Sequence, residues 1–133
     1  MTLREVLHAH IPTLRTESTI RDAVDKMDIY QFPALVIVDE DIKPIAVITE
    51  GDVCRAVASN ESLVSIMHEP ALAHATKFPT VVAADLEISE ALHKMLMSGL
   101  TILPIVETDR LIGIVLRTDL MQALFVDASE LTA

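Results

Sequence analysis

Few side chains of this chain are placed where they could do chemistry. Thr49 and Asp52 lie three residues apart directly after an apolar run, and Asp119 follows a second apolar run. An Asp at the start of a helix accepts hydrogen bonds from free backbone N–H groups, so this placement by itself predicts helix capping. The single cysteine, Cys54, excludes an internal disulfide and a CxxC metal site, and we expect it to be a buried, inert thiol.

The histidines suggest a metal site only weakly. His8 and His10 lie two residues apart, and His68 and His74 occupy a corresponding segment later in the chain. Imidazoles brought together from two segments could bind zinc, but the chain contains neither HExxH nor CxxC. It also lacks a GxSxG sequence and a Gly-rich phosphate loop. We therefore expect no metal, no required cofactor and no enzymatic activity.

Composition excludes several classes of protein. The chain has 133 residues, 51% of them hydrophobic, which excludes intrinsic disorder and suits one domain. Ten basic and twenty acidic residues give a net charge of -10, which argues against nucleic-acid binding. No apolar run approaches the roughly 18 residues that a membrane span needs. We expect a cytoplasmic protein with no membrane partner.

The chain repeats itself at an offset of 68 residues, which becomes 67 after a one-residue deletion. We infer one paired module over residues 1–133, with copies at 2–60 and 61–126 and a tail at 127–133. The following residues of the first copy recur in the second: Ile20, Ala23, Lys26, Met27, Leu35, Ile37, Val38, Asp41, Ile45, Asp52 and Ala56.

Each copy predicts the same order of elements, in an α/β (α+β) fold. Helical periodicity begins at Ile20 and Ile88, and Thr19 with Asp22 resembles a capping box, while Asp85 is the expected cap of the second helix. The final helices begin near Asp52 and Asp119, and we expect Val53, Val57, Leu120 and Leu124 to face the core. Strands are expected at Ala34–Val38, Ile45–Ile48, Leu103–Val106 and Leu111–Leu116, with a short strand near Thr80–Ala83.

These features together resemble the CBS domain, a β-α-β-β-α unit of about 60 residues whose last strand ends in Thr-x-x-Asp before a helix. The resemblance covers residues 2–126 and rests on the duplication, the order and the spacing together. The strings that carry it are Val38–Asp39, Ala46–Asp52, Leu103–Glu107 and Gly113–Asp119. Two copies in tandem resemble a CBS pair, or Bateman module. The resemblance implies two motifs packed about a pseudo-twofold axis.

The resemblance also implies a function. CBS pairs are regulatory sensors that bind AMP, ADP, ATP or S-adenosylmethionine in clefts between the motifs and signal to a partner protein, here unknown. They commonly form homodimers, and the helices that begin near Asp52 and Asp119 would form that surface. The Asp commonly holds the ribose hydroxyls, a task that suits an acceptor-only carboxylate. The implied first site contains Thr49, Asp52, Leu72, Ala73, Leu100 and Thr101, and the implied second site contains Phe32, Pro33 and Asp119.

Three departures from the family pattern keep another function open. Leu116 stands where the second site should have Thr or Ser. Ala34 and Ile102 stand where some nucleotide-binding members have a basic residue for phosphate. The alternative is therefore a ligand-free dimerisation or protein-interaction module, and a metal-responsive protein using the histidines is a third hypothesis.

Overall fold

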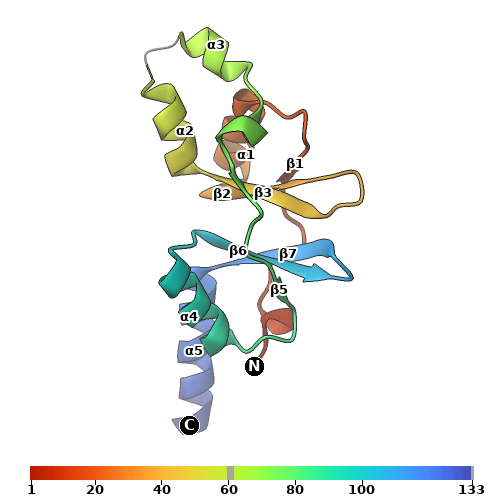
Figure 1. Cartoon of the computed structure of the whole chain (residues 1–133). Coiled ribbons are helices and arrows are strands. Elements are labelled where there is room, and N and C mark those ends of the chain that lie inside the picture. Colours follow the sequence, from red (N-terminus) through yellow and green to blue (C-terminus); the bar gives the residue numbers. More distant parts are fainter. Residues whose placement is uncertain (60–61, 133) are drawn as a thin grey trace. The chain divides into compact units, whose positions relative to one another are not determined.

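The computed structural model describes residues 1–59 and 62–132, with side chains to residue 130. The chain divides into two compact units of mixed helix and sheet, which confirms the predicted fold class (Figure 1). Unit 1 joins Met1–Ile11 to Thr80–Ala133, and unit 2 is Pro12–Pro79. The boundaries of these units therefore differ from those of the sequence repeats.

Unit 2 is built on a four-stranded sheet in the order β1-β2-β3-β4. β1 runs parallel to β2, whereas β2, β3 and β4 are antiparallel neighbours. The short strands β1 and β4 were not expected from the sequence. The elements are β1 (Thr13–Leu14), α1 (Ile20–Tyr30), β2 (Ala34–Val38), β3 (Pro44–Thr49), α2 (Glu50–Val57), α3 (Leu63–Met67), the 3-10 helix η2 (Ala71–His74) and β4 (Thr76–Lys77).

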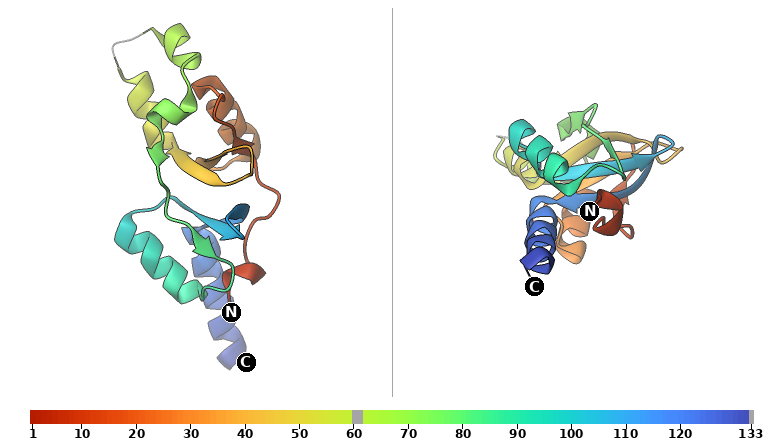
Figure 2. Two further views of the ribbon diagram at one scale, coloured as in Figure 1. Left: turned by 45° about the vertical axis from the view of Figure 1, so that its right-hand side comes forward. Right: turned by 90° about the horizontal axis from the view of Figure 1, so that it is seen from below.

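Unit 1 is built on a three-stranded sheet in the order β5-β6-β7, with β5 parallel to β6 and β6 antiparallel to β7. α4 and α5 lie side by side, and the second half of α5 extends past the end of α4 (Figure 2). Residues 127–132 of the predicted tail (127–133) continue α5, and residue 133 lies outside the described residues. The elements are the 3-10 helix η1 (Leu3–Glu5), β5 (Val82–Ala83), α4 (Ile88–Ser98), β6 (Ile102–Glu107), β7 (Arg110–Leu116) and α5 (Arg117–Thr132).

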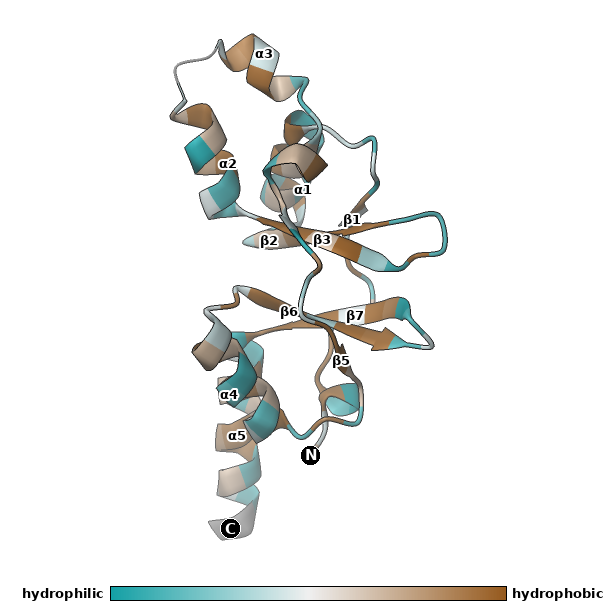
Figure 3. Ribbon diagram, in the orientation of Figure 1, coloured by the Kyte–Doolittle hydropathy of each residue, from teal (hydrophilic) through white to brown (hydrophobic). Residues whose placement is uncertain are grey.

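Each unit has its own apolar core. All five residues of β2 are buried, and Leu35, Ile37 and Ile48 pack with α1 and α2 residues in unit 2. Leu103 and Ile105 are equally buried in unit 1. Hydrophobic residues lie mainly along the strands, and hydrophilic residues lie in the loops of the hairpins (Figure 3). No polar or charged residue is buried among those the structure describes, so apolar burial provides the main stabilisation of each unit.

The segment that precedes the first strand of each repeat, its leading segment, forms backbone hydrogen bonds at the start of the other repeat's helix. In unit 1, Ile88 N donates to Met1 O at 3.2 Å. In unit 2, Ile20 N donates to Glu69 O at 2.9 Å, and Ala71 N donates to Ser18 O at 2.8 Å. Since these backbone groups are obligatory hydrogen-bonding groups, the exchange explains why the units do not follow the repeat boundaries.

Three expectations about single residues are wrong. The N-cap of α4 is Glu87, which makes no side-chain cap bond, because Met1 O accepts from Ile88 N instead; Asp85 contacts Arg4 at 3.5 Å. The buried face of α2 runs through Val53 and Ala56, which leaves Val57, the last helical residue, 46% exposed. Cys54 follows Val53 on the same helix and is also exposed, so burial does not protect its thiol.

One further finding concerns the helices as a set. In the part of the chain that the structure describes, none of them has both the length and the apolar character needed to cross a membrane.

Gly113 on β7 lies where the backbone of residues 7–8 passes very close to the strand. His8 N donates to Ile114 O at 2.9 Å, and Ile114 N donates to His8 O at 3.1 Å. A Cβ on Gly113 would lie 2.6 Å from His8 O and 2.7 Å from a methyl carbon of Leu7. Only a glycine at this position of β7 allows the segment before residue 9 to pair there without a shift of backbone.

We predict that Gly113→Ala lowers the free energy of unfolding by about 1–3 kcal/mol, because the added methyl must displace backbone. Gly51→Ala is the matched control, since its Cβ would meet the flexible Arg55 guanidinium at 3.3 Å and Thr49 Oγ1 at an ordinary contact distance of 3.6 Å, and alanine favours the helix. Urea unfolding measures both. Equal stability of Gly113→Ala and the native protein would contradict the close approach.

Candidate functional site

The candidate site of unit 2 lies where β3 runs directly into α2. β3 ends at Thr49 and α2 begins at Glu50, so the first-turn N–H groups need acceptors outside the helix. Thr49 Oγ1 accepts from Asp52 N at 3.2 Å, and Asp52 Oδ2 accepts from Thr49 N at 2.9 Å. This reciprocal capping box fixes the position of the Asp52 carboxylate, whose side chain is 10% exposed.

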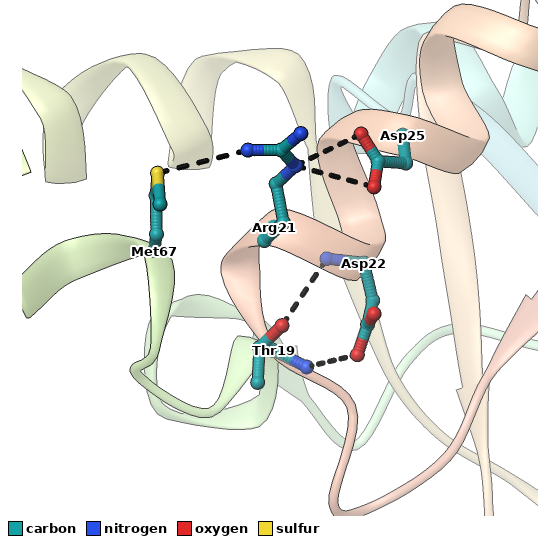
Figure 4. Close-up of polar contacts among 5 residues, drawn as sticks. All are labelled: Thr19, Arg21, Asp22, Asp25 and Met67. Carbon is teal, nitrogen blue, oxygen red and sulfur yellow. Dashed lines mark hydrogen bonds and ion pairs between the residues drawn. The ribbon is translucent and has the colours of Figure 1, made fainter. Parts of the chain in front are cut away.

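The same device occurs at the start of α1, as the sequence predicted. Thr19 Oγ1 accepts from Asp22 N at 3.2 Å, and Asp22 Oδ2 accepts from Thr19 N at 2.8 Å (Figure 4). In Figure 4 the neighbouring Arg21 turns away from this box and donates to Asp25. A Thr-x-x-Asp capping box is therefore not by itself a mark of a binding site, and α1 provides an internal reference for α2.

The Asp52 carboxylate has a second partner that the reference lacks. Arg55 Nη2 donates to Asp52 Oδ1 at 2.5 Å from one turn further along α2. The Arg55 side chain is 73% exposed, so this ion pair is weak and easily replaced. We did not single out Arg55 in the sequence, although its spacing of three residues from Asp52 on a predicted helix indicates the contact.

The matching junction of unit 1 is only half a capping box. Asp119 Oδ2 accepts from Leu116 N at 2.8 Å, but Leu116 has no hydroxyl to return a bond. The same oxygen faces His8 Nε2 at 2.9 Å. The Asp119 side chain is 22% exposed, against 41% for His8. The two predicted ribose-binding carboxylates thus have different surroundings.

Two predicted adenine contacts lie beside the α2 junction. Pro33 O accepts from Glu50 N at 2.9 Å, which places the start of β2 against the start of α2. Phe32 and Pro33 line a cleft of about 440 Å³ together with Val53 and Cys54. Phe32, which the sequence assigned to the same site as Asp119, belongs to the unit that contains Asp52.

The remaining contacts divide between the units. Leu72 and Ala73 lie on η2 in unit 2, where Leu72 packs against the core and Ala73 is exposed. Leu100 and Thr101 lie in unit 1, just before Ile102, which pairs with Leu116. The combinations of Asp52 with Leu100 and of Asp119 with Phe32 stay predictions. Unit 2 holds Thr49, Asp52, Leu72, Ala73, Phe32 and Pro33, and unit 1 holds Leu100, Thr101 and Asp119.

The histidines lie in separate contacts. His8 faces Asp119 in unit 1, and His74 pairs with Glu69 in unit 2. Within residues 1–59 and 62–132, no group of three or more His, Cys, Asp and Glu side chains could hold a metal ion.

Comparison with known proteins shows which family shares the sequence pattern of the two repeats. The family described as CBS domain matches residues 3–59 and 65–126. A 17.7 kDa uncharacterized protein of Acidianus ambivalens is 31% identical over 121 residues, which cover 90% of this chain and 71% of that protein. Inosine-5'-monophosphate dehydrogenase of Methanocaldococcus jannaschii is 29% identical over 119 residues, but the match spans 89% of this chain and only 22% of that enzyme.

Solved structures share the fold. CBSX2, solved in complex with AMP, has a TM-score of 0.83 at 18% identity, covering 96% of this chain and 98% of that one. The CBS domain pair of protein MJ0100, solved with 5'-methylthioadenosine and S-adenosyl-L-methionine, has a TM-score of 0.79 at 22% identity, covering 96% of this chain and 98% of that one.

We predict that Thr49→Ala and Thr19→Ala each lower the free energy of unfolding by about 0.5–2 kcal/mol, because each removes the hydroxyl acceptor of a capping box. Thr→Ser at either position keeps the acceptor and should preserve stability. Chemical denaturation compares the four variants. A loss at Thr19 without a loss at Thr49 would mean that Thr49 does not cap α2.

Proposed function

This chain belongs to the CBS domain family, and from that premise we propose that it is a regulatory module that binds an adenosyl ligand and signals its presence to a partner protein. The candidate ligands are AMP, ADP, ATP and S-adenosylmethionine. The proposal needs no catalytic group and no metal. It rests on the Asp52 carboxylate at the start of α2.

The observation that carries the proposal is the acceptor capacity of Asp52. A carboxylate offers about four lone-pair positions on its two oxygens. Thr49 N takes one position on Oδ2, and Arg55 takes one on Oδ1. One position on each oxygen therefore remains for the two hydroxyls of a ribose cis-diol. The carboxylate is fixed by its cap and largely buried, so little ordering is needed on binding.

The purine needs apolar surface near this carboxylate. Leu72 on η2 and the neighbouring Ala73 belong to the same unit as Asp52, and we propose that they contact the adenine. Leu100 and Thr101 complete the proposed site, as the family pattern implies. The same family pattern implies a second set, Phe32, Pro33 and Asp119, whose carboxylate already faces His8.

Charge favours the less anionic ligands. The chain carries a net charge of -10, and Arg55 is the cation that contacts Asp52 in the described part of the chain. A protein of this charge repels a single phosphate, or the sulfonium and amino acid of S-adenosylmethionine, less than it repels a triphosphate. We therefore propose AMP or S-adenosylmethionine ahead of ADP and ATP.

Signalling requires that the ligand prefer one arrangement of the protein over another, since a ligand with equal affinity for both shifts nothing. We propose that the partner recognises the ligand-bound arrangement.

A second candidate function is supported by the surface of α5. Leu120 and Ala123 are buried in unit 1, yet Phe125 is 72% exposed and Met121 is 43% exposed on the same helix. A helix that is apolar on more than one face usually has a second partner. This surface favours a homodimerisation or protein-interaction module, which needs no ligand.

Calorimetric titration with AMP and with S-adenosylmethionine tests the adenosyl proposal. We predict binding to the native protein and a loss of about 10- to 100-fold in affinity for Asp52→Ala, because charge-assisted hydrogen bonds to the diol are removed. Asp22→Ala is the matched control. It removes the same capping carboxylate from α1, and we expect it to lose stability but to keep full affinity.

Two outcomes would contradict the proposal. Binding that survives Asp52→Ala would move the ligand away from this carboxylate. No binding of either compound, with a dimeric mass in sedimentation equilibrium, would favour the interaction module instead.

A further inference from the structure

The two junction aspartates differ in how their Oδ2 atoms are occupied. Asp52 Oδ2 accepts one bond, from Thr49 N. Asp119 Oδ2 faces two nitrogens, Leu116 N at 2.8 Å and His8 Nε2 at 2.9 Å. Since a carboxylate oxygen has about two lone-pair positions, Asp119 Oδ2 is full. A cis-diol that needs one position on each oxygen can be accepted at Asp52 but not at Asp119.

His8 is held in place by its own backbone. Its N–H and C=O both pair with Ile114 on β7, and the missing side chain of Gly113 allows this approach. The imidazole is thus presented to Asp119 by a fixed segment, and the contact costs less side-chain ordering than one between free surface residues.

Unit 2 contains a natural comparison. β4 pairs with β3 so that Thr76 lies opposite Val47, as His8 lies opposite Ile114 in unit 1. The offsets of 68 and 67 residues make these the equivalent positions of the repeat. A threonine is too short to replace an imidazole, and the partners of Asp52 are Thr49 and Arg55. The contact that blocks the carboxylate therefore occurs in unit 1, where this position holds His8. In the described part of unit 2, where it holds Thr76, this contact is absent from the partners of Asp52.

We propose that His8 occupies the ribose position of Asp119, so that the chain binds one adenosyl ligand, at Asp52, and His8 is the residue that sets this number. The inference rests on the proposed function, because it takes the ribose diol as the group that the junction carboxylates accept. His8 is a specificity-determining residue that acts through Asp119 rather than by contact with a bound ligand. Its removal opens Oδ2 of Asp119 to a second diol.

Equilibrium dialysis with saturating AMP measures the number of ligands per chain. We expect one AMP for the native protein and two for His8→Ala. The double variant His8→Ala/Asp119→Asn should return to one, because an amide accepts at only one of its two ends while still capping Leu116 N. His10→Ala is the matched control: His10 is an exposed histidine two residues away, and its removal should leave one AMP bound.

The outcomes separate this inference from the proposed function. A second equivalent that appears in His8→Ala and disappears with Asp119→Asn supports the inference, whatever the native protein binds. If His8→Ala binds no additional AMP, the inference is overturned. It is also overturned if Asp119→Asn alone binds fewer AMP molecules than the native protein, because Asp119 would then already hold a ligand. The proposed function is judged separately, by the native protein and Asp52→Ala.

Discussion

The structure of this chain depends on one local constraint: a sheet strand that passes directly into a helix leaves first-turn N–H groups without partners. β3 meets α2 in this way, and β7 meets α5. In both units an aspartate in the first turn of the helix accepts a hydrogen bond from the backbone N–H of the last strand residue. The cap places a fixed and mostly buried carboxylate at an end of each sheet. The proposed ligand chemistry uses what the capping requirement already put there.

The two units satisfy this constraint differently, and we propose that the difference gives them different binding properties. Thr49 completes a reciprocal box, so Asp52 keeps acceptor capacity on both oxygens, and an exposed arginine is its remaining partner. Leu116 cannot reciprocate, and His8 fills the oxygen that the cap leaves half used. The duplicated sequence has therefore not given the two aspartates the same partners. The exchange of leading segments between the repeats makes this possible, because it brings residues 1–11 to unit 1.

Much of the fold follows from periodicity, and the errors have identifiable causes. Apolar runs predicted β2, β3, β6 and β7 within one or two residues, and the Thr19–Asp22 box was predicted from spacing alone. Asp85 was not a cap because a segment far away in the sequence supplies the backbone partners at α4. The pair of β4 with β3 and the contact of His8 with Asp119 are also long-range and leave no local pattern. Gly113, unlike Ala46 at the equivalent position, was the one local sign of the close approach.

The most direct test of the central claim compares AMP with 2',3'-dideoxyadenosine 5'-monophosphate, for the native protein and for Asp52→Asn. If the capping carboxylate also accepts a ribose diol, the native protein should bind the dideoxy compound about 10- to 100-fold more weakly than AMP. Asp52→Asn should bind both compounds with similar, low affinity. Equal affinity of the native protein for the two nucleotides would contradict the account and leave Asp52 a helix cap alone.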